Sequence, residues 1–295
     1  MNRNEGNLNK NELPDNNFDQ DAMNSFSEEW KKFNYMNSEF DSDLDSQFNA
    51  YTSPIDLTIF NQKTSIAADF GAGSGRWTSR ILKHFSLIFA IEPSEGAIEV
   101  LREKFLGESK VTVLKESIGR NSIPDESLDF AMSLGVLHHV PDTSQGLKDI
   151  SKKIKPGGSF LCYLYYSLEG KSSMYRNLFV VSNLIRRLIS NLPYVARKVL
   201  SGLIALIVYY PLARLSKYAQ NRGKDVSNFP LHHYAEMPFI MMQNDALDRF
   251  GTRLEQRFSK DAISEMLELA GFDLSTLVFS EKEPYWTFSV NRKME

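Results

Sequence analysis

Cysteine is almost absent from this 295-residue chain, which contains a single one, Cys162. One cysteine cannot form an internal disulfide, so disulfide-stapled folds are excluded. The chain also has only five histidines and no Cys-x-x-Cys spacing, which argues against a zinc site. We therefore expect no metal.

The chain has little net charge and no apolar run near its start. A formal charge of −3 is too small to indicate a nucleic-acid partner. Without an apolar run in the first residues we expect no secretory signal, and hence a cytoplasmic protein. Residues 1–24 are rich in Asn, Asp and Glu, which predicts a disordered tail.

Residues 25–60 contain aromatic side chains at irregular spacing, among them Phe26, Trp30 and Tyr51. We expect this segment to form helices that fold over a ligand site as a lid. Ordinary core packing is the alternative, because aromatic residues at such spacings serve either purpose.

Acidic residues are absent between Lys171 and Lys224, where ten Lys and Arg residues occur. The segment is also apolar, and its longest apolar run ends at Pro211, short of the about 20 residues of a transmembrane helix. These features predict a basic amphipathic helical insertion. It would either contact a membrane surface peripherally at the inner face, roof an amphipathic acceptor, or form a plain cap with solvated cations.

The most informative motif that is present lies at residues 66–75, Ile-Ala-Ala-Asp-Phe-Gly-Ala-Gly-Ser-Gly. A short apolar run predicts a buried strand, and the three alternating glycines let the backbone turn close to a ligand. A P-loop is excluded because Arg76 follows Gly75 where that motif needs Lys. A dinucleotide fingerprint would need its third glycine at position 76.

Alternating elements follow this turn. A second apolar strand, 87–91, ends in Glu92, where a carboxylate could hold a ribose hydroxyl pair. Helices are expected through Phe85, at 95–105 and from about 138. Further strands are expected at 110–114, 128–134 and 159–166. After a helix at about 258–270, two strands at 273–280 and 284–291 form a hairpin. The pattern predicts an α/β fold with a doubly wound parallel sheet.

Together, the segments 69–75, 124–129, 133–142 and 154–158 and the residue Glu92 resemble the class I S-adenosylmethionine-dependent methyltransferases, in the broad group that includes ubiquinone-biosynthesis enzymes. This resemblance implies a seven-stranded Rossmann-like sheet, an antiparallel C-terminal hairpin and S-adenosylmethionine as cofactor. The expected parts are a core at 61–166, a helical cap at 167–250, and a C-terminal helix with edge strands at 251–295.

The resemblance also implies residue roles. Asp69 would brace the turn or contact the methionine amine through water, and Glu92 would accept the ribose hydroxyls. The acid that the family often places against adenine is missing, and Glu116 is a poorly phased substitute. The remaining expected cofactor contacts are Gly71, Ala72, Gly73, Gly75, Ser117, Ile118, Leu134 and Gly135.

Methyl transfer from a sulfonium needs a base only when the acceptor is a hydroxyl or a protonated amine. His138 and His139 are the first candidates, with packing as the alternative, and His233 is the second. One of Tyr165 and Tyr166 should face the site. The mixed charges of 245–255 could anchor a loop or contact a polar acceptor.

The sequence thus predicts methyl transfer to oxygen, or less readily nitrogen or carbon, of a small-molecule, lipid-linked or glycan-linked acceptor. A membrane-associated quinone or lipid methyltransferase is one alternative. A non-catalytic nucleoside-binding module is the other.

Overall fold

The computed structural model describes residues 41–226, 229–281 and 286–294, together with the single positions 17, 23 and 27. The tail predicted at 1–24 and the first part of the predicted lid, 25–40, lie outside the described residues apart from those single positions.

A seven-stranded sheet forms the centre of the protein, in the order β3-β2-β1-β4-β5-β7-β6. The first five strands run parallel and β7 is antiparallel to both neighbours, which confirms the predicted Rossmann-like sheet with its C-terminal hairpin. The strands are β1 (Ile66–Phe70), β2 (Leu87–Ile91), β3 (Val111–Leu114), β4 (Leu128–Leu134), β5 (Ile154–Tyr163), β6 (Phe272–Phe279) and β7 (Thr287–Arg292).

Strand β5 begins at Ile154, earlier than the predicted start at 159. Ile154 pairs with Leu128, and the register shifts before Ser159 pairs with Phe130. Gly157 adopts a φ of +74°, which a glycine reaches without strain. The glycine pair was expected to separate helix from strand, but the strand accommodates it as an irregularity.

Five helices accompany the sheet: α2 (Asp41–Tyr51), α3 (Thr78–Ile81), α4 (Glu95–Lys104), α5 (Thr143–Lys153) and α10 (Lys260–Leu269). Two differ from expectation. The helix predicted through Phe85 is confined to α3. The histidine pair lies in a short 3₁₀ turn, η3 (Leu137–His139), and α5 starts after it, where the Asp142 carboxylate accepts a hydrogen bond from the Gln145 amide.

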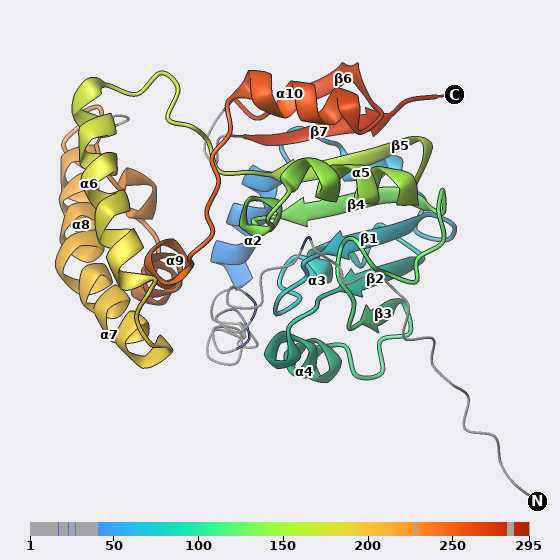
Figure 1. Ribbon diagram of the computed structural model, residues 1–295, viewed down its shortest axis with the longest axis horizontal. Coiled ribbons are helices and arrows are strands. Elements are labelled where there is room, and N and C mark those ends of the chain that lie inside the picture. The colour runs from blue at the N-terminus through green and yellow to red at the C-terminus, as the bar shows by residue number, and fades with distance from the viewer. Residues whose placement is uncertain are drawn as a thin grey trace, which may run out of the picture.

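The insertion after β5 is helical. It contains α6 (Ser173–Ile189), α7 (Tyr194–Ile204), the π-helical segment η4 (Ala205–Tyr209), α8 (Tyr210–Gln220), the 3₁₀ turn η5 (His232–Tyr234) and α9 (Phe239–Gly251). Figure 1 shows α6, α7 and α8 standing together at one side of the sheet, with α9 on the side of this group that faces α2.

The expectation that this part of the insertion is too short for a transmembrane helix was wrong. Helical structure continues from Tyr194 to Gln220, and Pro211 falls in the first turn of α8. A proline inside a helix leaves one carbonyl without its donor, and the wider η4 segment just before it accommodates that gap. By length and composition this is the one helix in the described part of the chain that could cross a membrane, and 28% of its most apolar window is buried.

A stripe of small side chains fixes the insertion to α9. Ala205 and Ala213 are fully buried, with Tyr209 between them, and they pack with Met242 and Ala246 of α9. The four-residue spacing places the stripe on one face of the helix. A separate apolar cluster joins the sheet to α5 and α10, and another joins it to α2.

Candidate active site

The glycine turn after β1 has the backbone that its sequence requires. Gly71, Gly73 and Gly75 have φ values of +81°, +56° and +72°, a region that favours glycine. A Cβ at Gly71 would lie 2.5 Å from Val136, and one at Gly75 would lie 2.6 Å from Phe105. The absence of a side chain at Gly75 therefore makes room for Phe105, at the end of α4.

Two carboxylates support this turn. Glu92 accepts the Gly73 amide at 3.0 Å through one oxygen and the Ser94 amide at 2.9 Å through the other. Each oxygen keeps capacity for a further donor. Asp69 accepts the Thr78 hydroxyl at 2.6 Å, and burial raises its pKa to about 7. Glu92 lines the cavity described below, whereas Asp69 lies behind the turn and does not line it.

One cavity of about 980 Å³ joins the glycine turn to the helical insertion. Small-molecule sites span about 300–1,000 Å³, so this volume can hold a cofactor and an acceptor together. Of the predicted cofactor contacts it is lined by Gly71, Ala72, Glu92, Ser117, Ile118, Leu134 and Gly135. Gly73 and Gly75 are buried beneath the turn.

The expected absence of an acid at the adenine end is visible in the structure. The Glu116 carboxylate accepts the amide of Ser122 at 2.7 Å and its hydroxyl at 3.0 Å, so it belongs to a local turn. Asn121 donates to the carbonyl of Ile118 at 2.8 Å and holds the loop that carries Ser117.

The histidine pair is split by the fold. The His138 side chain is fully buried and does not line the cavity, and its ring stacks on Tyr165 at 3.7 Å. Burial holds its pKa well below the usual value. The His139 ring lines the cavity, with Nδ1 2.8 Å from the Leu254 carbonyl oxygen and Nε2 3.3 Å from Asp248 Oδ1.

The Leu254 carbonyl and the Asp248 carboxylate face the two nitrogens of His139, so the surroundings favour the protonated ring. Burial alone would lower its pKa, but the Asp248 carboxylate outweighs burial and raises it. In turn, His139 lowers the pKa of Asp248 against the effect of burial. Asp248 also accepts the Tyr165 hydroxyl at 2.6 Å. Each nitrogen thus faces an oxygen atom of the protein, which makes His139 a weaker candidate for the base.

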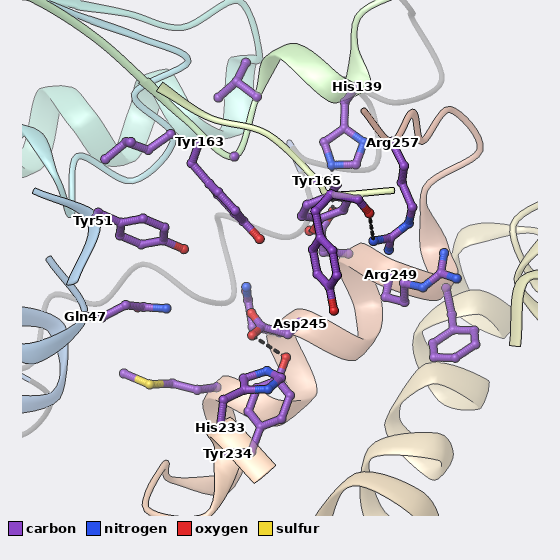
Figure 2. Close-up of a pocket in the computed structure, with 18 of the residues that line it drawn as sticks. Gln47, Tyr51, His139, Tyr163, Tyr165, His233, Tyr234, Asp245, Arg249 and Arg257 are labelled. Atoms are coloured by element: carbon purple, nitrogen blue, oxygen red, sulfur yellow. Dashed lines mark hydrogen bonds and ion pairs between the residues drawn. The ribbon is translucent and has the colours of Figure 1, made fainter. Parts of the chain in front are cut away.

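A second acidic residue on α9, Asp245, lies one turn before Asp248 and lines the same cavity. One of its oxygens accepts the Tyr234 hydroxyl at 2.7 Å, and burial raises the carboxyl pKa. Figure 2 shows Asp245 facing an open centre that Tyr51 and Tyr163 also face. The spacing Asp-x-x-Asp on one helix face was the signal that could have identified these two residues.

The remaining histidine candidate, His233, lies on η5 with its ring 4.0 Å from that of Tyr234. Its ring surface is open to the cavity, yet the surrounding protein, with His232 and Lys171 nearby, lowers its pKa to about 4. It is neutral at physiological pH.

The described part of the predicted lid, residues 41–60, contains α2 and the short 3₁₀ turn η2 (Leu57–Ile59), and α2 has two faces. Gln47, Ala50 and Tyr51 line the cavity, while Leu44 and Phe48 are buried in the core. The Tyr51 ring lies 5.4 Å from Trp77 and 5.2 Å from Tyr163. Helix α2 therefore packs against the core with one face and lines the cavity with the other. In the described part of the chain, no group of three or more His, Cys, Asp or Glu side chains could hold a metal ion.

Comparison with protein families identifies the segment that carries the glycine turn and Glu92. Residues 68–162 match the model of the methyltransferase domain. This segment is a methyltransferase domain. The match confirms the resemblance to class I methyltransferases, whose cofactor is S-adenosylmethionine. The methyltransferase domain ends with β5, so the helical insertion and the acidic residues of α9 lie outside the matched residues.

Curated relatives align over the methyltransferase domain. An uncharacterized methyltransferase of Geobacillus sp. (strain WCH70) is 29% identical over 102 residues, 34% of this chain and 47% of that protein. A demethylmenaquinone methyltransferase of Staphylococcus aureus (strain JH9) is 29% identical over 104 residues, 34% of this chain and 43% of that protein. The chain thus spans about half the length of these relatives.

A solved structure resembles the chain well beyond the methyltransferase domain. Human N-acetylserotonin methyltransferase in complex with S-adenosylmethionine matches with a TM-score of 0.50 and 14% identity, over 92% of this chain and 55% of that one. At this identity the likeness shows the fold alone.

Proposed function

We propose that the chain transfers a methyl group from S-adenosylmethionine to an oxygen, or less readily a nitrogen, of a small-molecule acceptor. The main support for this proposal is that one cavity has the glycine turn and Glu92 at one end and Asp245 at the other. Tyr51, Tyr163 and Tyr234 line the cavity near Asp245. When bound, the cofactor supplies a methyl group on a positively charged sulfur.

The residues of the turn fit that cofactor. Glu92 has free acceptor capacity on both oxygens for a ribose hydroxyl pair. Ser117 and Ile118 lie where adenine would pack, and Leu134 would face the methyl donor. Asp69 holds the turn in place through Thr78. In this proposal Gly73 contributes through its amide, which fixes Glu92.

Asp245 is the residue we assign as general base for a hydroxyl acceptor. His138 does not line the cavity and both nitrogens of His139 face protein oxygens, whereas Asp245 is a cavity carboxylate with a raised pKa. Asp245 would take the proton of the acceptor hydroxyl while the methyl carbon passes to the acceptor oxygen and its bond to the cofactor's sulfur breaks. A pKa raised toward neutrality makes a carboxylate a stronger base.

The acceptor side of the cavity favours a molecule with an apolar body. The insertion contributes mainly aliphatic side chains there, namely Leu178, Val181, Ile185, Ile204, Val208 and Leu212. A lipid-linked or quinone acceptor, reached at the inner membrane face and methylated on oxygen or carbon, is therefore the second candidate. The Staphylococcus relative is named a demethylmenaquinone methyltransferase, but its match is confined to the domain.

Two measurements test the proposal. Calorimetry should show S-adenosylmethionine binding by the wild type and none by Gly73→Arg, because an arginine cannot adopt this backbone without strain. Labelled methyl transfer into an extract of the source cells, with the product identified by mass, should then reveal the acceptor. Binding without transfer into any extract would support the non-catalytic module, and no binding at all would refute the proposal.

A further inference from the structure

The outer face of the helical insertion is apolar. Thirteen large apolar side chains between positions 180 and 218 are exposed and do not line the cavity. We call them the outer face: Val180, Leu184, Leu188, Leu192, Val195, Val199, Leu200, Leu203, Leu206, Ile207, Tyr210, Leu215 and Tyr218.

The outer face is a continuous feature of the helices and not a scatter of single residues. Val195, Val199 and Leu203 recur every four residues along α7, on the side opposite the buried positions Ser201 and Ala205. Val195 is 72% exposed and Leu188 on α6 is 67% exposed. Contiguous apolar patches of this kind mark interaction surfaces.

The charge of the same helices selects the kind of partner. All 37 Asp and Glu residues of the chain lie outside 171–224, a segment with ten cations. Some cations serve the fold: Arg197 donates to the Gly251 carbonyl at 2.7 Å and Arg214 to the Ala235 carbonyl at 2.7 Å. The exposed ones are Arg176, Arg187, Lys198, Arg222 and Lys224.

We propose that the outer face of α6, α7 and α8 docks on the surface of an anionic lipid bilayer. Apolar side chains on helices that carry cations and no carboxylate of their own suit the boundary between acyl chains and anionic headgroups. A second copy of this chain fits worse, because its own outer face would bring a second set of cations against the first.

The helix lies on the bilayer and does not cross it. Its inner stripe packs on α9, and Arg197 and Arg214 bind carbonyls at the two ends of that packing. Spanning a membrane would strip both guanidinium groups of their partners and place them in hydrocarbon, which is costly. Docking leaves these bonds in place.

The cavity and the outer face share helices. Leu178, Val181, Ile185 and Val208 line the cavity and are also 41–55% exposed. An apolar acceptor could therefore pass from the bilayer into the cavity along α6 and η4. This last step rests on the proposed function, whereas the docking itself does not.

Vesicle flotation of the full chain tests the docking. The expected result is flotation with vesicles of phosphatidylcholine and phosphatidylglycerol, little with phosphatidylcholine alone, and release by high salt. Equal binding to both vesicle types, or no binding to either, would overturn the proposal. Retention on the vesicles after alkaline carbonate extraction would overturn it in favour of a spanning helix.

Charged substitutions locate the surface. Leu188→Glu and Leu206→Glu should each reduce vesicle binding at least tenfold, and Lys198→Gln by a smaller factor. The matched controls are Leu106→Glu and Leu269→Glu, at apolar positions outside the helical insertion that are 87% and 64% exposed. These variants should bind vesicles like wild type. Loss of binding in the controls, or its retention in the outer-face variants, would contradict the assignment.

Two readouts separate this proposal from its rivals. Circular dichroism and the unfolding temperature must match wild type, so that a lost interaction is not a lost fold. Calorimetry with S-adenosylmethionine reports on the proposed function separately, because the outer face does not line the cavity. A dimer that Leu206→Glu dissociates, with no vesicle binding by wild type, would instead assign the face to self-association.

Discussion

The ring of His139 and the carboxylate of Asp248 form a buried ion pair in the cavity wall, with Nε2 3.3 Å from Oδ1. The pair joins η3, which lies within the methyltransferase domain segment, to α9, more than a hundred positions later in the chain. It gives His139, one of the predicted candidates for the base, a contact that ties the methyltransferase domain segment to α9.

Replacing His139 by Gln should destabilise the fold by about 3 kcal/mol, since a buried carboxylate loses its partner. The raised pKa of His139 means that its contribution is complete below pH 6.5 and is lost as the pH rises through the folded value. The lowered pKa of Asp248 means that its contribution is present above pH 3.8 and is lost as the pH falls through the folded value.

The stability difference between wild type and His139→Gln should therefore be largest between about pH 4 and 6.5 and shrink at alkaline pH. Urea unfolding at several pH values measures it. His233→Gln is the control, because that ring is open to the cavity. A pH-independent difference would show that the ion pair is not its source.

Glu92→Gln should weaken S-adenosylmethionine by about 1–3 kcal/mol, the scale of a lost charged acceptor. The side-chain amide of this variant keeps one oxygen, which can still accept one of the two backbone hydrogen bonds that Glu92 accepts. The glycine turn should therefore keep its structure. Glu116→Gln is the matched control, because its carboxylate serves a local turn with Ser122, and its affinity should stay close to wild type. Calorimetry measures both, and equal affinities for all three proteins would refute the role of Glu92.

Asp245→Asn should lower kcat by about 10²–10⁴-fold if the acceptor is a hydroxyl, with cofactor affinity unchanged. In the wild type the rate should rise as the pH passes upward through the raised pKa of Asp245. Tyr234→Phe removes the hydrogen bond that favours the carboxylate, so the midpoint should move to higher pH. Full activity in Asp245→Asn would exclude it as the base.

Gly75→Ala and Gly107→Ala separate backbone strain from steric contact. Both glycines have positive φ, but a Cβ at Gly107 meets nothing within 4 Å, whereas one at Gly75 meets Phe105. Gly107→Ala should cost about 1 kcal/mol from strain alone, and Gly75→Ala distinctly more. Thermal unfolding gives the comparison, and equal losses would mean that Phe105 moves aside freely.

The sequence predicted the sheet well because buried parallel strands are short apolar runs, as in β1, β2 and β4. The ends of the strands and helices were harder to predict. Strand β5 includes Gly157 and Gly158, and this extension of the strand depends on its pairing with β4. The apolar run was measured only as far as Pro211, and the π-helical segment that lets the helix continue past this proline leaves no local signal.

At the site, the cofactor end was predictable because its residues are close in sequence and follow a fixed spacing. The acceptor end of the site could not be predicted from the sequence. His139 could be judged only with Asp248 in view, and Asp245 only with Tyr234, because protonation depends on neighbours that folding brings from α9 and η5.

The π-helical segment Ala205–Tyr209 sets the rotational phase of everything after it in the insertion. Each residue turns an α-helix by about 100°, so removing one residue there would rotate α8 by that angle relative to α7. Ala213 would leave α9, and Arg214 would swing away from the Ala235 carbonyl that it now binds. The extra residue in the π-helical segment therefore determines which side of the 27-residue helix packs against the rest of the protein and which side is exposed to a partner.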